Sequence, residues 1–251
     1  MKAGATPIVV RATRPIAVWL ATMAALMATY GQTRVRDIFT AVAGRNVDEV
    51  KRLIAGDKSV VAARTEDGKT PLALLINTDQ MKIGGLDGPD FHGTMQERDE
   101  SKDLQIAALL LAAGADINAR DNAGRTPLIT AIVDKKVSFA RFLIEKGADV
   151  NGVVGAEGGA TPLHAAVGHG QVGTITILVG QGARLNAQTT DGNTPLHIAA
   201  LYHKTEAART LLQLGADPSI KNAKGQTPLE AARAKADNDL VVVLSGTSRK
   251  K

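Results

Sequence analysis

Apolar and polar residues alternate along this chain in blocks that return at a nearly constant interval. Each block opens on the tripeptide Thr-Pro-Leu, which begins at Thr70, Thr126, Thr161, Thr194 and Thr227. The last two intervals are 33 residues, the one before them is 35 and the first is 56. A fixed period of this length is typical of repeat architectures in which each unit is one supersecondary element.

Within a unit, the pattern predicts two short helices. Thr is a good helix N-cap and Pro is tolerated at the first helical position, so Thr-Pro predicts a helix start. A small Ala follows five residues later, and a second apolar helix ends at Gly, which accepts the left-handed conformation. Asp-Gly pairs then indicate a tight turn before the next Thr-Pro. The positions that repeat are Ala131, Ala166, Ala199 and Ala232 on the first helix, and Leu143, Leu178, Leu211 and Leu244 on the second.

Two of these blocks, Thr161-Pro-Leu-His-Ala-Ala166 and Thr194-Pro-Leu-His-Ile-Ala-Ala200, resemble the ankyrin repeat, whose period is 33 residues and whose mark is T-P-L-H-x-A. The resemblance covers about residues 36–246. It implies an all-α ankyrin-repeat solenoid of about six helix-turn-helix units with β-hairpin loops. The expected units are 36–69, 70–125 with an insertion at 79–101, 126–160, 161–193, 194–226 and 227–246, after a linker at 32–35 and before a basic tail at 247–251.

Two units depart from the pattern in their first helix. The second has Leu75 where Ala is usual, and the third has Ile129 where the family has His. The first unit has Arg36 in place of Thr, as a capping unit tolerates. The last carries Glu230 and Arg233 on its first helix, and such charges suit the polar outer face that a terminal repeat presents to water.

The insertion at 79–101 lengthens the connection between the two helices of the second unit. It is rich in Gly, so it indicates a loop. Three interpretations stay open: a tolerated surface loop, a partner-specific finger, and a divalent-cation site built from Asp87, Asp90, His92 and Asp99, whose spacing matches no known loop. This segment is expected to pack against Leu75.

A smaller expansion lengthens the hairpin at 152–159. It places an apolar pair, Val153 and Val154, on a Gly-flanked tip. An exposed apolar pair is either an accident or a contact point, and the sequence favours neither.

The first 31 residues have the pattern of an export signal. Lys2, Arg11 and Arg14 precede an uncharged run from Pro15 to Tyr30, and no acidic residue occurs among them. The run is shorter than the roughly 20 apolar residues that span a bilayer, which favours cleavage over a permanent anchor. An uncleaved anchor and a simple amphipathic or disordered leader are the alternatives.

Charge and cysteine content narrow the possible functions. The formal net charge is +5, but the leader and the last three residues, Arg249, Lys250 and Lys251, supply it, so nucleic-acid binding is not expected. The absence of cysteine excludes disulfides and thiolate chemistry.

No motif indicates an enzyme. The chain has no nucleophile elbow, phosphate-binding loop, zinc-protease motif or dinucleotide fingerprint. The resemblance implies that His164 and His197 are structural, each bonding a neighbouring loop. Metal binding by this pair lacks a third ligand. We therefore expect no enzyme activity and no cofactor.

The resemblance also implies a binding surface made of the hairpin tips and the first helix of each unit. Tyr202 is the strongest single anchor, because aromatic residues are enriched at interface hot spots. The residues expected to contact a partner are Glu66, Asp67, Lys69, Asn122, Arg125, Val133, Asp134, His169, Asn193, Leu201, Tyr202, Lys224 and Gln226.

Three functional hypotheses follow. The first is an exported bacterial protein, periplasmic or secreted, that is a monomer, contacts no membrane once the signal is cleaved, and binds a protein partner. The second is a scaffold anchored in the inner membrane by residues 15–30. The third is a hydrolytic or metal-dependent enzyme that uses the insertion.

Overall fold

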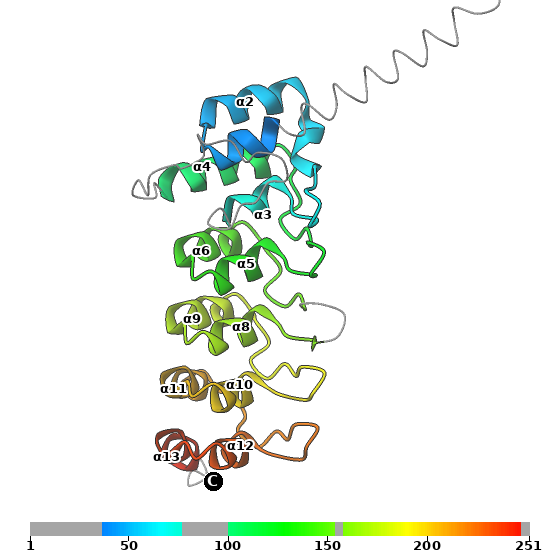
Figure 1. Ribbon diagram of the computed structural model, residues 1–251. Helices are drawn as coiled ribbons and strands as arrows, with labels where there is room; N and C mark the ends of the chain where they lie inside the picture. Colours follow the sequence, from blue (N-terminus) through cyan, green and yellow to red (C-terminus); the bar gives the residue numbers. More distant parts are fainter. Residues whose placement is uncertain (1–36, 77–99, 154–157, 247–251) are drawn as a thin grey trace, which may run out of the picture.

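The computed structural model describes residues 37–76, 100–153 and 158–246 of the chain. In this part the helices form pairs that stack in single file, from the N-terminal pair at one end to α13 at the other (Figure 1). No β-strand occurs in the described ranges, so the predicted all-α solenoid is confirmed. The first pair comprises a helix at residues 37–43 and α2 (Val47–Gly56), followed by the 3-10 helix η1 (Lys58–Ala62). The other helices are α3 (Pro71–Ile76), α4 (Glu100–Ala112), α5 (Pro127–Val133), α6 (Val137–Glu145), α8 (Pro162–Gly168), α9 (Val172–Gly180), α10 (Pro195–Leu201), α11 (Thr205–Gln213), α12 (Pro228–Ala234) and α13 (Asn238–Gly246).

Each of the five repeated Thr-Pro-Leu sites starts a first helix, as predicted. Thr126 has an extended backbone, and its hydroxyl accepts a hydrogen bond from the N–H of Ile129. In the last unit Thr227 and Glu230 form a reciprocal capping box, in which each side chain accepts from the backbone N–H of the other residue. These bonds satisfy N–H groups that have no partner within the helix.

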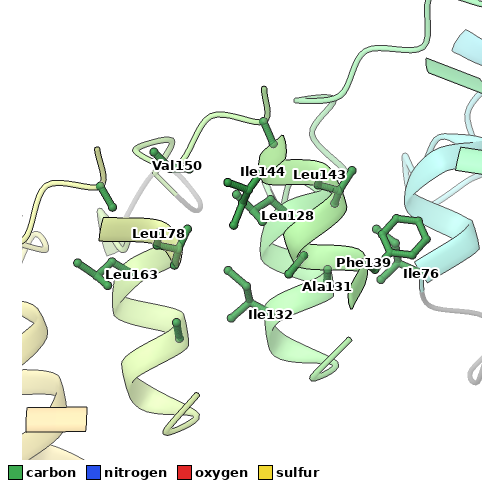
Figure 2. Close-up of a cluster of buried hydrophobic side chains, with 14 of the residues drawn as sticks. Ile76, Leu128, Ala131, Ile132, Phe139, Leu143, Ile144, Val150, Leu163 and Leu178 are labelled. Carbon is green, nitrogen blue, oxygen red and sulfur yellow. The ribbon is translucent and has the colours of Figure 1, made fainter. Parts of the chain in front are cut away.

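The repeated apolar positions are buried and build one continuous core. In the third unit Leu128, Ala131 and Leu143 are fully buried, and they lie between side chains of the units on either side (Figure 2). Alanine at the central position lets neighbouring helices approach closely, and the leucines fill the space between them. The equivalent positions of the later units are Leu163, Ala166, Leu178, Leu196, Ala199, Leu211, Ala232 and Leu244, each at most 1% exposed, and Leu229, which is half-buried.

Contacts run between adjacent units. The first helices α3, α5, α8, α10 and α12 touch in that order, and so do the second helices α4, α6, α9, α11 and α13. Each unit therefore buries its apolar face against its neighbours, which makes the described stack one quasi-linear domain.

The second unit contains the predicted long interval, between the end of α3 and the start of α4. Residues 77–99, which include most of the insertion and its four candidate cation ligands, lie outside the described residues. Leu75 is 1% exposed within the core formed by the described residues. On α4, Asp103 is buried and accepts a 2.7 Å hydrogen bond from Arg45 of the first unit.

The ends of the chain are outside this description. Residues 1–36 contain the predicted export signal and linker, and residues 247–251 contain the basic tail. Within the described ranges, no helix has the length and hydrophobicity needed to cross a bilayer.

Candidate interaction surface

Four loops that connect successive units share one backbone geometry. They cover residues 65–69, 121–125, 189–193 and 222–226 and project to one side of the stack (Figure 1). In each loop the N–H of the first residue donates to the carbonyl of the fifth, with N···O distances of 2.9 or 3.0 Å. The fourth residue is a glycine with a φ between 73° and 79°, and its N–H donates to the first carbonyl. Glycine adopts this left-handed conformation without strain, so the loops are tight hairpins without strands.

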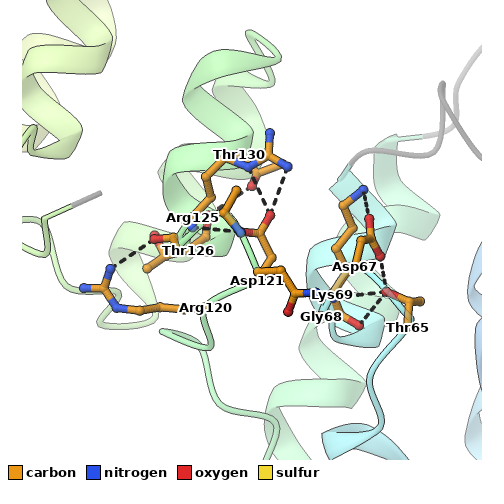
Figure 3. Close-up of polar contacts among 12 residues, drawn as sticks. Thr65, Asp67, Gly68, Lys69, Arg120, Asp121, Arg125, Thr126 and Thr130 are labelled. Carbon is orange, nitrogen blue, oxygen red and sulfur yellow. Dashed lines mark hydrogen bonds and ion pairs between the residues drawn. The ribbon is translucent and has the colours of Figure 1, made fainter. Parts of the chain in front are cut away.

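Polar side chains fix the shape of these tips (Figure 3). The Asp121 carboxylate accepts hydrogen bonds from the backbone N–H of Arg125, at 2.8 Å, and forms an ion pair with its guanidinium, at 2.9 Å. In the preceding hairpin the Thr65 hydroxyl accepts from the N–H of Lys69, whose ammonium pairs with Asp67 at 2.7 Å. Asp and Thr stabilise turns in this way because their side chains bond nearby backbone groups.

Successive hairpins are also bonded to one another. The N–H of Asn122 donates to the carbonyl of Asp67 at 3.0 Å, and the N–H of Ala223 donates to that of Asp191 at 2.9 Å. The residue directly before a hairpin donates side-chain hydrogen bonds to the carbonyl of the glycine in that hairpin and to a carbonyl in the next connection between units. The residues at this position are Arg64, Arg120 and Gln188.

The two predicted structural histidines join a first helix to the next hairpin. His164 and His197 are 3% and 0% exposed, and each Nδ1 lies 3.1 Å from the backbone nitrogen of its own N-cap Thr. Since that nitrogen can only donate, Nδ1 is unprotonated and Nε2 carries the hydrogen. Nε2 donates to the carbonyl of Asn193 at 3.1 Å and of Gln226 at 2.8 Å, respectively. Burial lowers the pKa of both histidines, and the bonds to these carbonyls partly oppose this effect.

A second ladder of polar side chains was not anticipated from the sequence. In the loops that follow the second helices, three asparagines accept a hydrogen bond from a backbone N–H of the next unit. Their spacing of 33 and 35 residues is the signal that could have revealed them. They are Asn118, Asn151 and Asn186.

Eight of the predicted partner-binding residues lie in the hairpin tips. The side chains of two also form bonds between units: Asn122 Nδ2 donates to the Glu66 carbonyl at 2.9 Å, and Asn193 Oδ1 accepts from Asn222 at 3.0 Å. Their part in binding stays a prediction. Glu66, Asp67, Asn122 and Lys224 are exposed, and Lys69, Arg125, Asn193 and Gln226 are half-buried.

The other five predicted residues lie where the first helices end. Tyr202 is the C-cap of α10 and is 59% exposed, whereas Leu201 beside it is half-buried. His169 is the exposed C-cap of α8. Val133 ends α5 with 37% exposure, and Asp134 follows it, half-buried. These residues belong to the far ends of helices that begin at the hairpins, so they are separated from the tips by the length of a helix.

The turns that contain Asp134, His169 and Tyr202 also carry five basic residues that were not among the predicted ones: Lys135, Lys136, His203, Lys204 and Lys235. The two helices of units three to six are joined by short turns at 134–136, 169–171, 202–204 and 235–237, which we call the turn row. Each turn covers the eighth to tenth residues after the Thr that starts its unit, and each carries at least one basic residue. The basic residues of the turn row are Lys135, Lys136, His169, His203, Lys204 and Lys235.

The described residues contain no group of three or more His, Asp or Glu side chains arranged to hold a metal ion. Both shifted histidines have each ring nitrogen bonded to backbone within the stack, which suits a structural role. This arrangement presents side chains in fixed positions along a ridged surface.

Comparison with protein families agrees with the repeat geometry. A family model for ankyrin repeats in three copies matches residues 98–189, and one for ankyrin repeats in many copies matches residues 178–232. Together the two matches cover more than half of the chain. The chain belongs to the ankyrin-repeat family, whose repeats are protein-protein interaction modules.

The curated relatives share only the repeats. The chain is 37% identical over 140 residues to the neurogenic locus Notch protein of Drosophila melanogaster, which covers 55% of this chain and 5% of that protein. It is 28% identical over 137 residues to the ANK repeat-containing protein nipk-1 of Caenorhabditis elegans, covering 54% and 20%. It is 38% identical over 80 residues to the mouse B-cell lymphoma 3 protein homolog, covering 32% and 17%. The aligned region spans a fifth or less of each of these relatives.

Proposed function

We propose that this protein is an exported, non-enzymatic module that binds a partner protein through its hairpin tips and the exposed ends of its first helices. The observation that carries the proposal is the bonding between units. Hairpins, histidine clips and asparagine ladders each join one unit to the next, so the surface is ordered before any partner arrives. Pre-organisation lowers the entropy cost of association.

The exposed ends of the first helices supply the apolar anchors for this proposal. Tyr202 and Val133 are among the few large hydrophobic residues with substantial exposure in the described stack. A tyrosine at 59% exposure has a large apolar ring to bury and a hydroxyl to hydrogen-bond, which suits a hot spot. We therefore place the energetic centre of the interface near α10.

Capture experiments with the full chain test this surface. Tagged wild type and the double variant Val133→Ser/Tyr202→Ala are used to capture proteins from a periplasmic or secreted fraction. Leu214→Ala is the matched control, because Leu214 is as exposed as Val133 but ends the second helix α11. We expect one specific partner with wild type and the control, and its loss with the double variant. Equal recovery of that partner by all three proteins would refute the proposed surface.

Export is proposed from the basic and apolar pattern of residues 1–31. We place the mature protein in the periplasm or outside a bacterial cell, with cleavage near Gln32. N-terminal sequencing of the protein from fractionated cells tests this directly. A mature chain starting near residue 32 in the soluble periplasmic fraction supports export. An intact N-terminus in the membrane fraction would favour the anchored scaffold instead.

A further inference from the structure

The turn row forms a continuous surface across units three to six. Gln171 Nε2 donates to the carbonyl of Ile132 at the end of α5, which joins the third unit to the fourth. A Cβ added to Gly170 would lie 3.5 Å from Cδ of Lys204, so this lysine lies against the turn of the fourth unit. His203 Nδ1 lies 2.9 Å from Asp237 Oδ2, which joins the fifth unit to the sixth.

The exposed charge of the turn row is positive. Lys135 and Lys235 are exposed and Lys204 is half-buried, and none of the three has an ion-pair partner within the described ranges. The carboxylate of Asp237 does not neutralise these lysines at the surface. It is 10% exposed and accepts hydrogen bonds from both His203 and the N–H of Leu240. Apart from the half-buried Asp134, the turn row therefore presents ammonium groups without a complementary carboxylate, beside an exposed tyrosine.

We infer that the turn row binds an extended acidic segment of the partner protein, with carboxylates on Lys135, Lys204 and Lys235 and an apolar side chain on Tyr202. This inference rests on the proposed function and names the chemistry of the partner. Complementary charge of this kind speeds association and selects the partner. The aromatic anchor adds apolar burial that charge alone does not provide.

The spacing of the repeats sets the pattern of the segment. Packed helices lie roughly 8–10 Å apart, so equivalent turns of adjacent units are separated by about 10 Å. An extended chain advances about 3.3 Å per residue, and three residues cover one unit. Carboxylates at every third position would then match the lysines, and a segment of about ten residues would cover the turns from the third unit to the sixth.

A protein segment fits these observations better than a nucleic acid does. Phosphates recur at every nucleotide, and nucleic-acid binders meet them with a dense basic face. Here the unpaired lysines occur once each in the turns of the third, fifth and sixth units and are absent from the turn of the fourth, which consists of His169, Gly170 and Gln171. Sparse cations favour a ligand whose charges are equally sparse.

Fluorescence anisotropy with labelled twelve-residue peptides tests the inference on the purified full chain. One peptide carries Glu at every third position between neutral residues and a central Leu. An isomer has the same composition with its Glu residues adjacent, and a single-stranded DNA of twelve nucleotides is the third probe. We expect the spaced peptide to bind at least about tenfold more tightly than the isomer or the DNA, with weakening at high salt.

The protein variants locate the site. The triple variant Lys135→Gln/Lys204→Gln/Lys235→Gln should bind the spaced peptide at least about tenfold more weakly. Each exposed ion pair contributes only a small part of the binding free energy, but this variant loses all three. Lys58→Gln, an exposed lysine at the start of η1 in the first unit, is the matched control and should bind as wild type does. Circular dichroism confirms that each variant is folded. Tyr202→Ala should weaken binding at every salt concentration.

Three results would overturn the inference: equal binding of the spaced and adjacent peptides, binding of DNA as tight as that of the spaced peptide, or unchanged binding by the folded triple variant. Each outcome leaves the proposed function separately testable. A natural partner that is captured through Val133 and Tyr202 while the peptides fail would uphold the interaction surface and reject only its acidic ligand.

Discussion

The buried histidine clip should make the stability of this protein depend on His197 and on pH. His197 is fully buried, accepts from the N–H of Thr194 through Nδ1 and donates to the carbonyl of Gln226 through Nε2. The substitution His197→Ala removes the side chain that forms both of these hydrogen bonds. It leaves a buried donor and a partly buried acceptor without their bonds, and it opens a cavity where the ring was.

The size of the effect follows from these losses. A buried polar group left unsatisfied costs about 1–3 kcal/mol. With two such groups, one of them partly accessible to water, we expect the free energy of unfolding to fall by roughly 3 kcal/mol. Urea unfolding at pH 7.5, followed by circular dichroism at 222 nm, measures it. His169→Ala is the matched control, because His169 is exposed, and it should change stability by less than about 0.5 kcal/mol.

The same geometry fixes the sign of the pH dependence. Burial holds the pKa of His164 and His197 below the ordinary value, so both stay neutral in the folded state while the unfolded chain takes up protons. Their contribution is therefore fully present above about pH 6.5 and is lost as the pH falls below it. Each histidine contributes a slope of at most about 1.4 kcal/mol per pH unit.

Comparing wild type with His197→Ala between pH 7.5 and 5.5 isolates this effect, because carboxylates titrate mostly at lower pH. We expect wild type to lose stability on acidification and the variant to lose about half as much, since only His164 remains. An identical slope in the two proteins would refute the assignment of a neutral clip. So would a gain of stability as the pH falls.

Three further predictions concern the stack, and each is measured by urea unfolding unless stated otherwise. Leu163→Ala should cost about 3 kcal/mol because Leu163 is fully buried, while Leu214→Ala, at 37% exposure, should cost less than about 1 kcal/mol. Gly192 and Gly225 share a φ of 73°, but a Cβ on Gly192 would lie 2.7 Å from a backbone nitrogen of the next hairpin and one on Gly225 would meet nothing within 4 Å. Gly192→Ala should therefore destabilise more than Gly225→Ala by at least about 1 kcal/mol, and equal losses would contradict the close approach of the hairpins. Arg120→Ala removes bonds to its own tip and to the next hairpin, so hydrogen exchange should speed up at residues 121–125 while global stability changes by about 1 kcal/mol.

The helices and their order could be predicted from sequence because local chemistry sets them. Thr126 caps helix α5 and Pro127 begins it, and both act through nearby residues of the chain. The recurrence of Ala and Leu every 33 residues predicts which helix faces are buried. Short-range rules of this kind repeat faithfully in a solenoid, where each unit sees only its neighbours. The structural role expected for His164 and His197 came from the resemblance to the ankyrin repeat.

Other features depended on how one unit lies against the next. The sequence marked Asn122 and Asn193 as partner-binding residues, but only the stack shows that their side chains also bond adjacent hairpins. The lysines of the turn row were missed for a related reason. Lys135, Lys204 and Lys235 are far apart in the chain, and their alignment on one edge exists only because equivalent turns are superposed by stacking.

The sequence by itself therefore determined the unit: its helices, its hairpin and its buried face. Only the tertiary structure decided which polar groups form hydrogen bonds between units and which remain exposed for a partner to contact. The physical reason is that helix starts and turns depend on neighbours in the chain, whereas the accessibility and pairing of a side chain depend on whatever the next repeat places beside it.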